Sequence, residues 1–161
     1  MSAGPSARLR GWGAALAVAA VVIALDQGSK AAITAALEPG ERISLVFGIE
    51  LVDVSNRGIA FGLFGGGGSI VLAVTIVALG GMLVWFALQS SRPGLWLAVG
   101  LLARGALGNL ADRAREDAVT DFIDPPLWPA FNLADVAIAL GAVGLVLVVF
   151  AADRPSPARG P

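Results

Sequence analysis

Long apolar stretches alternate with short polar segments along the chain. A helix needs roughly 20 mostly apolar residues to cross the hydrocarbon core of a bilayer. Four stretches are close to this length, and they cover residues 12–37, 69–88, 94–112 and 132–152. The pattern therefore predicts an all-α polytopic membrane protein with four transmembrane helices, organised as a single membrane-embedded domain over residues 1–161.

The segment between the first two predicted helices, residues 38–68, has a different pattern. Residues 43–47 and 49–54 are rich in Val, Ile, Leu and Phe, and Gly48 separates them. Short runs of this kind, interrupted by glycine, are typical of β-strands. We expect a small β-sheet element here, lying on the extracytoplasmic side of the membrane.

Composition supports the membrane assignment and excludes several kinds of chemistry. Hydrophobic residues make up 57% of the chain and charged residues only 14%, with a mean hydropathy of +0.80. Cysteine and histidine are absent, which excludes disulfides, a thiol nucleophile and a histidine-based triad and removes the usual zinc ligands. The net charge is −1 without a basic cluster, so nucleic acid is not an expected partner. We expect neither a metal nor another cofactor.

The N-terminus is similar to a secretory signal, because Arg8 and Arg10 precede an apolar run over residues 12–25. The apolar pattern nevertheless resumes beyond Asp26 and Lys30, and three more stretches follow. We therefore interpret this run as an uncleaved first transmembrane helix.

Basic residues give the predicted orientation. Arg8 and Arg10 precede the first predicted helix, and Arg92 lies in the short connection between the second and third. The positive-inside rule then places both termini in the cytoplasm, although the other two loops hold four arginines as well. This orientation places Trp12, Trp85 and Trp96 near the cytoplasmic interface, where an aromatic belt is expected.

In this orientation the polar residues of the apolar stretches and of the loops meet at the extracytoplasmic face. They are Asp26, Lys30, Asn56, Asn109, Asp112, Arg113, Asp121, Asn132 and Asp135. Ionisable residues near hydrocarbon are costly and therefore usually functional. A channel or a proton-coupled transporter would need such groups throughout the membrane thickness, so this distribution favours a site that opens on one face.

Structural interpretations of the same residues remain open. Asp26 and Lys30 have the i,i+4 spacing of a helical ion pair, and Asn132 with Asp135 has the spacing of a helix N-cap and its third helical residue. Asp121 could be a solvated carboxylate in a polar loop. A small transporter and a structural membrane subunit are therefore the alternative functions.

Five motifs occur in order along the chain: DQGSK at 26–30, NRGIAFG at 56–62, GALGNLADR at 105–113, VTDFI at 119–123 and FNLAD at 131–135. With these motifs the chain resembles the signal peptidase II (lipoprotein signal peptidase) family over residues 12–150. The resemblance implies an intramembrane aspartic endopeptidase with Asp121 and Asp135 as its catalytic dyad. The other matched residues would bind substrate or support the dyad, and they are Asp26, Lys30, Asn56, Asn109, Asp112, Arg113 and Asn132.

The resemblance also implies a substrate and a location. Enzymes of this family cut bacterial prolipoproteins just before a cysteine that carries a diacylglyceryl group. The expected partners are these lipid-modified prolipoproteins and membrane lipids, the expected state is a monomer, and the expected location is the bacterial cytoplasmic (inner) membrane, with the active site near the extracytoplasmic face. Two carboxylates sharing one proton would activate water, because like charges in low-dielectric surroundings do not both ionise easily.

Some residues depart from the family pattern or remain ambiguous. Arg104 stands where the family usually has a glycine, and we hypothesise that its side chain extends to the interface or pairs with Asp26. Residues 124–130 form a short, proline-rich connection, so we expect a stiff loop. Asp124 in this loop is a carboxylate that the sequence alone does not separate from the dyad. Arg113 would stabilise oxyanion charge or anchor its helix at the interface.

Overall fold

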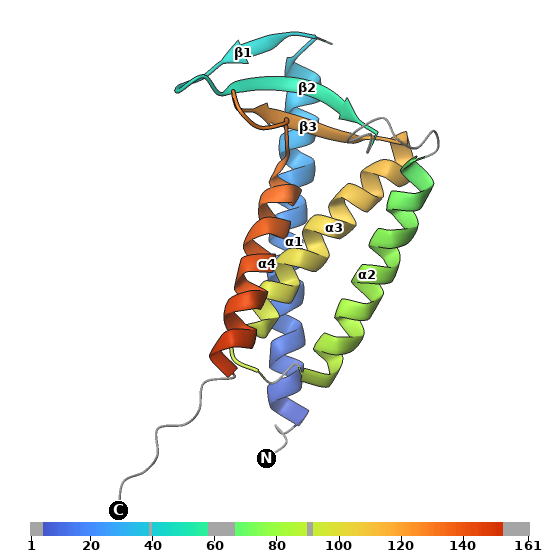
Figure 1. The fold of residues 1–161 in the computed structure, drawn as a ribbon, viewed down its shortest axis with the longest axis vertical. Coiled ribbons are helices and arrows are strands. Elements are labelled where there is room, and N and C mark those ends of the chain that lie inside the picture. The colour runs from blue at the N-terminus through green and yellow to red at the C-terminus, as the bar shows by residue number, and fades with distance from the viewer. Residues whose placement is uncertain (1–4, 39, 58–66, 90–91, 153–161) are drawn as a thin grey trace, which may run out of the picture.

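Four helices stand side by side, and a small sheet lies across one end of them (Figure 1). The computed structural model describes residues 5–38, 40–57, 67–89 and 92–152. Its elements in chain order are α1 (Pro5–Ala36), β1 (Arg42–Ser44), β2 (Glu50–Asn56), α2 (Gly67–Gln89), α3 (Leu95–Glu116), β3 (Val119–Asp124) and α4 (Leu133–Ala152). Residues 58–62 of the second motif lie outside the described residues.

The prediction of a mainly helical protein with four helices and a small sheet is confirmed. Among the described residues, two segments are long and apolar enough to cross a membrane, Trp12–Ala36 and Leu133–Ala151, and a shorter apolar segment covers Ala73–Gln89. The apolar sequence of α3 is interrupted by polar residues, including Arg104 and Asp112. That all four helices cross the membrane therefore stays a prediction.

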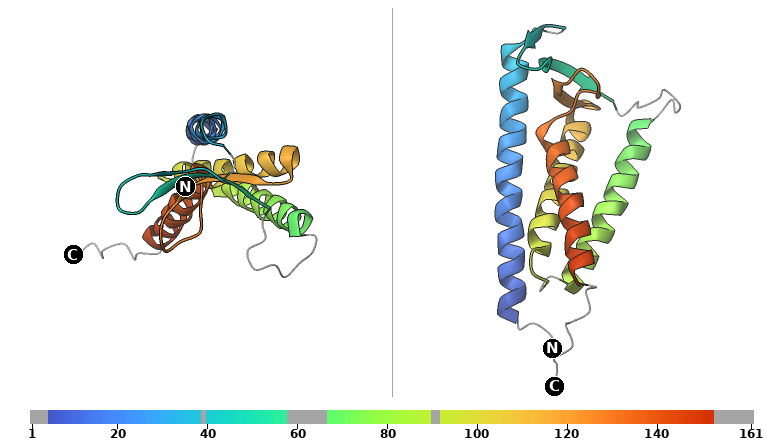
Figure 2. Two further views of the ribbon diagram at one scale, coloured as in Figure 1. Left: turned by 90° about the horizontal axis from the view of Figure 1, so that it is seen from above. Right: turned by 60° about the vertical axis from the view of Figure 1, so that its left-hand side comes forward.

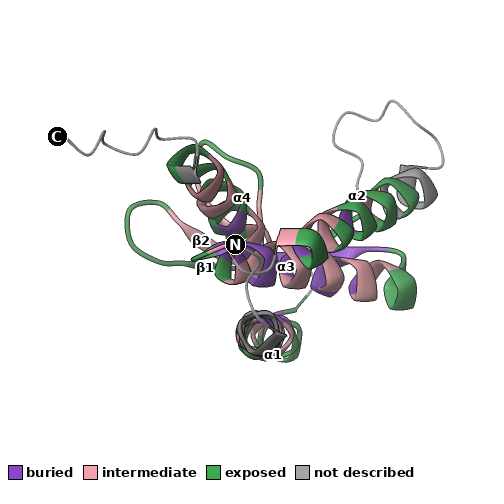
Figure 3. Ribbon diagram, turned by 90° about the horizontal axis from the view of Figure 1, so that it is seen from below, coloured by how far each residue is buried: buried purple, intermediate pink, exposed green. Residues whose placement is uncertain are grey.

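α3 is the central helix of the bundle and contacts α1, α2 and α4. Small and polar residues of α3 are buried, among them Gly100, Gly105, Gly108, Asn109 and Asp112. The other three helices expose large apolar side chains on their outer surfaces, and Figure 3 shows these exposed faces along α1, α2 and α4. Polar groups inside and apolar groups outside are expected of a bundle surrounded by lipid.

A hydrophobic core joins α1, α2 and α3 at the end remote from the sheet. Ala15, Phe86, Leu95 and Val99 are buried in it. The rings of Trp12 and Phe86 meet edge to face, with centroids 4.6 Å apart, an arrangement that stabilises aromatic pairs. Apolar packing therefore joins the helices at this end, whereas polar groups join them at the sheet end.

Glycines allow α3 and α4 to approach closely. A Cβ atom at Gly105 would overlap the carbonyl oxygen of Ala134, and one at Gly141 would lie 2.8 Å from the carbonyl oxygen of Ala98. Small residues at helix contacts are the usual way for membrane helices to pack backbone against backbone. This approach places the end of α3 that carries Asn109 directly beside the first turn of α4.

The sheet is antiparallel with the strand order β1-β2-β3. Its third strand corrects a prediction, because residues 119–124 form β3 rather than part of a polar loop. β-Branched and aromatic residues favour strands, and Val119, Thr120 and Phe122 supplied that signal, which the polar Asp121 obscured. β3 pairs with β2 and sets Asp121 opposite Val54.

Candidate active site

Asn132 caps the N-terminus of α4 through reciprocal contacts with Asp135. The Asp135 N–H donates to Asn132 Oδ1 at 3.0 Å, and the Asn132 N–H donates to Asp135 Oδ2 at 3.3 Å. These contacts satisfy backbone donors that a helix leaves unpaired in its first turn. The cap predicted from the sequence is therefore confirmed, and it fixes the Asp135 carboxylate at the start of α4.

Asp121 is held by two asparagines. Its Oδ1 accepts a hydrogen bond from Asn132 Nδ2 at 2.6 Å, and its Oδ2 accepts one from Asn56 Nδ2 at 2.8 Å. Only 2% of Asp121 is exposed, so it is not a solvated loop carboxylate. Asn132 therefore contacts both carboxylates of the predicted dyad, through its side-chain Nδ2 to Asp121 and through its backbone N–H to Asp135.

Burial raises the pKa of Asp121 above its ordinary value. Hydrogen bonds from Asn56 and Asn132 lower this pKa, the negative charge of Asp135 raises it, and the positive charge of Lys30 lowers it. The net effect is a raised pKa. Asp121 therefore keeps its proton to higher pH than an exposed aspartate does.

A buried network supports Asp135 from within the bundle. Asn109 Nδ2 donates to Asp135 Oδ1 at 2.8 Å, and Asn109 Oδ1 accepts from Lys30 Nζ at 3.2 Å. Lys30 Nζ also lies 2.7 Å from Asp26 Oδ2 and 2.5 Å from Asp112 Oδ2. The ion pair predicted between Asp26 and Lys30 is confirmed, and Asp112 is a second anionic partner of the same lysine.

Asp26 connects this network to the backbone of α4. Its Oδ1 accepts a hydrogen bond from the Ala134 N–H at 3.0 Å, and the N-terminus of a helix stabilises negative charge. Gly108 of α3 lets the Asp26 side chain of α1 come close to α3, because a Cβ atom at Gly108 would lie 3.2 Å from Asp26 Oδ2. One carboxylate of α1 therefore contacts both α4 and, through Lys30, α3.

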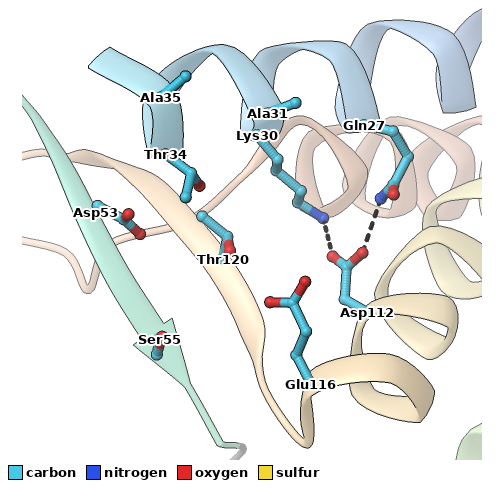
Figure 4. Close-up of a pocket in the computed structure, with 10 residues that line it drawn as sticks. All are labelled: Gln27, Lys30, Ala31, Thr34, Ala35, Asp53, Ser55, Asp112, Glu116 and Thr120. Atoms are coloured by element: carbon cyan, nitrogen blue, oxygen red, sulfur yellow. Dashed lines mark hydrogen bonds and ion pairs between the residues drawn. The ribbon is translucent and has the colours of Figure 1, made fainter. Parts of the chain in front are cut away.

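Two cavities lie beside the strands that carry this site. One, of about 330 Å³, is lined by Asp121, Asn56 and Val54 together with Ala130 of the loop before α4. The other, of about 430 Å³, is lined by polar side chains of α1, α3, β2 and β3 (Figure 4). Because successive strand residues point to opposite faces, Asp121 faces the first cavity while Thr120 faces the second. Of these two cavities, the first is therefore the one that Asp121 lines.

Gln27 is a network residue that the sequence analysis did not select. Its Nε2 donates to Asp112 Oδ1 at 2.8 Å, as Figure 4 shows beside the Lys30 contact. Gln27 precedes Lys30 by three residues, and residues at this spacing share one face of a helix. That spacing was the signal available in the sequence.

Arg113 is the one predicted site residue outside this set of contacts. Its Nε is buried and has no hydrogen-bond partner among the described residues, and the same is true of Arg104. The hypothesis that Arg104 pairs with Asp26 is wrong, because the basic residue paired with Asp26 among the described residues is Lys30. Asp124 differs from the two dyad residues in its partner, because its carboxylate forms an ion pair with Arg42 at 2.8 Å.

A helical bundle with an apolar outer surface and a buried polar network around two aspartates at one end is the arrangement expected of a membrane enzyme. The comparison with known proteins agrees. The family model described as signal peptidase (SPase) II matches residues 18–151. The chain belongs to the signal peptidase II family and is a peptidase.

Individual relatives support this assignment over most of the chain. The lipoprotein signal peptidase of Pelotomaculum thermopropionicum is 43% identical over 127 residues, which cover 78% of this chain and 84% of the relative. That of Nitratidesulfovibrio vulgaris is 37% identical over 155 residues, covering 90% and 93%. A bacterial membrane enzyme solved by the in meso method at 2.3 Å resolution has a TM-score of 0.80 at 25% identity, covering 92% of this chain and 95% of that one.

Proposed function

We propose that this chain removes signal peptides from lipid-modified bacterial prolipoproteins, cleaving before the lipidated cysteine with Asp121 and Asp135 as its catalytic dyad. The observation that carries the proposal is the contact of Asn132 with both carboxylates. Its Nδ2 donates to Asp121 Oδ1 at 2.6 Å, and its backbone N–H donates to Asp135 Oδ2 at 3.3 Å. It is supported by the family membership and by relatives named lipoprotein signal peptidase.

The two carboxylates take different roles in this proposal. Asp121 holds the shared proton, because burial and the charge of Asp135 raise its pKa. Asp135 carries the negative charge, which is stabilised by Asn109 Nδ2, by the Asn132 N–H and by the N-terminus of α4. A general base at Asp135 and a general acid at Asp121 follow from this difference.

The reaction proceeds by attack of water on the scissile carbonyl. Asp135 accepts a proton as the water oxygen bonds to the carbonyl carbon, and Asp121 donates a hydrogen bond to the oxygen that gains negative charge. When the tetrahedral intermediate collapses, the carbon–nitrogen bond breaks and the proton held by Asp135 passes to the leaving amine. The dyad then returns to its state with one shared proton.

The proposed membrane placement has four spans, both termini in the cytoplasm and the sheet on the extracytoplasmic side. The polar and charged residues that are buried in the described part all belong to the network at the sheet end: Asp26, Lys30, Asn109, Asp112, Asp121 and Asn132. Three tryptophans pack around the core at the other end, namely Trp12, Trp85 and Trp96, as an aromatic belt at the cytoplasmic interface would. A one-sided distribution favours a peptidase over a transporter.

Cleavage should depend on the lipid of the substrate. Purified protein in liposomes would be given a bacterial prolipoprotein with its diacylglyceryl group and the same precursor without it. We expect cleavage of the modified precursor only, with a product that begins at the lipidated cysteine, as read by mass spectrometry. Equal cleavage of both precursors, or of neither across several modified substrates, would contradict the proposed substrate.

The alkaline limb of the pH–rate profile should move when Asn56 is removed. As pH rises through the raised pKa of Asp121, the dyad becomes doubly ionised and kcat/KM falls. The Asn56 hydrogen bond lowers that pKa, so Asn56→Ala should shift the limb to higher pH. Thr120→Val, on the opposite face of β3, is the matched control and should leave the limb in place. A downward shift in Asn56→Ala would assign the proton to a different group.

A further inference from the structure

Two loops present large apolar side chains to the outside at the same end of the sheet. Val46 and Phe47 lie between β1 and β2, and Leu127 and Trp128 lie between β3 and α4; we call these four residues the apolar tip. Phe47 is 93% exposed, Leu127 95%, Trp128 70% and Val46 67%. Exposure of this extent, in side chains of this size, usually marks an interaction surface.

The two loops lie next to each other, so the four side chains project from neighbouring positions. A Cβ atom at Gly48 would lie 3.5 Å from Pro126 Cγ. The first loop is closed by the Leu45 N–H, which donates to the Ile49 carbonyl at 2.8 Å. The second contains Pro125, Pro126 and Pro129, whose fixed φ angles restrict its backbone.

Charged residues are absent from the apolar tip and stand just inside it. Residues 45–49 and 125–131 contain no Asp, Glu, Lys or Arg. Arg42, Glu50 and Asp124 form an exposed ion-paired cluster where the two loops meet the strands, with Arg42 NH1 2.6 Å from Glu50 and 2.8 Å from Asp124. An apolar edge bordered by a charged cluster is the pattern of a segment that lies at a membrane interface.

The position of the apolar tip identifies the lipid bilayer as its partner. Seen from above, the hairpin of β1 and β2 reaches sideways beyond α1 and α4 (Figure 2, left). Both helices expose apolar side chains along their length, including Leu16 and Val21 of α1 and Leu140 and Val143 of α4. Lipid that covers these faces would therefore lie directly below the overhanging hairpin. We propose that the apolar tip enters the interfacial layer of the leaflet nearest the sheet, with Trp128 at headgroup level.

This contact would set the height of the active site relative to the membrane. β3 carries Asp121 and runs directly into the loop that holds Leu127 and Trp128. Anchoring that loop in the interface keeps the Asp121 carboxylate at a constant depth, which suits a substrate that is itself held in the bilayer by its lipid. The consequence for Asp121 rests on the proposed function, whereas the lipid contact does not.

The absence of cysteine from the chain makes a direct test simple. Single cysteines in place of Phe47 and Leu127 would carry a nitroxide label, and the protein would be reconstituted in liposomes of phosphatidylethanolamine and phosphatidylglycerol. Electron paramagnetic resonance would then compare access of oxygen, which is enriched in lipid, with access of a water-soluble nickel chelate. Glu41→Cys and Arg115→Cys, both exposed at the same end of the molecule, are the matched controls.

We expect the oxygen-to-nickel accessibility ratio to be several-fold higher at positions 47 and 127 than at positions 41 and 115. Equal ratios at all four positions would show that the apolar tip is in water and would overturn the proposal. Shielding of the tip labels from both reagents would also overturn it, because it would mean that protein, such as a second copy of the chain, covers the tip. None of these outcomes depends on cleavage, so a failure of the lipid-contact proposal can be distinguished from a failure of the peptidase proposal.

Discussion

Asp121→Asn and Asp135→Asn should each reduce the cleavage rate of a lipidated prolipoprotein by roughly 10²–10⁴-fold or more, because each removes one partner of an acid–base pair. Asparagine is close to aspartate in size and retains hydrogen-bonding capacity, so the fold should persist. At position 121 the variant lacks the carboxyl group that would hold the shared proton. At position 135 it lacks the proposed general base. The measurement is single-turnover cleavage in liposomes, with thermal unfolding as the check of folding.

Asp124→Asn is the matched control for the dyad variants. Asp124 lies on the same strand as Asp121, three residues further along, but its carboxylate contacts Arg42 instead of the asparagines. We expect its cleavage rate to stay within a few-fold of wild type. Full activity in a folded Asp135→Asn protein would contradict the dyad, and loss of activity in Asp124→Asn alone would move the catalytic role to that residue.

Local features of the site could be predicted from the sequence because their partners are close along the chain. The ion pair of Asp26 with Lys30 follows from i,i+4 spacing on a helix. The contacts of Asn132 with Asp135 follow from the order of residues in a capped first turn. Both were predicted as structural features, and both are also parts of the candidate site.

Contacts between segments far apart in the chain could not be predicted from the sequence. Lys30 and Asp112 are 82 residues apart, and no local pattern indicates that one lysine serves carboxylates on two helices. The same limit explains the error about Arg104, since the sequence did not show which basic residue pairs with Asp26, and in the structure it is Lys30. β3 was missed for a related reason, because a strand that carries a buried carboxylate departs from the apolar pattern of strands.

Lys30→Met should destabilise the protein by roughly 3–5 kcal/mol, which is the usual cost of removing one partner from a buried ion pair. The side chain of Lys30 is 7% exposed and its Nζ contacts Asp26 and Asp112. Methionine preserves much of the apolar stem but leaves the two carboxylates without their shared cation. The free energy of unfolding would be measured by denaturant titration in mixed micelles. Cleavage should fall as well, because Asn109 loses the contact that helps to orient it toward Asp135.

Arg42→Met provides a control that differs chiefly in burial. Arg42 also bridges two carboxylates, Glu50 and Asp124, but its side chain is 54% exposed. Water and salt screen such a pair, so this variant should lose little stability. Adding Asp112→Asn should cost less in the Lys30→Met background than in wild type, because it removes a charge that no longer has its partner. Equal losses of unfolding free energy in the two methionine variants, with no coupling to Asp112, would contradict the prediction. They would mean that the buried ion pairs of Lys30 stabilise the protein no more than the exposed ones of Arg42.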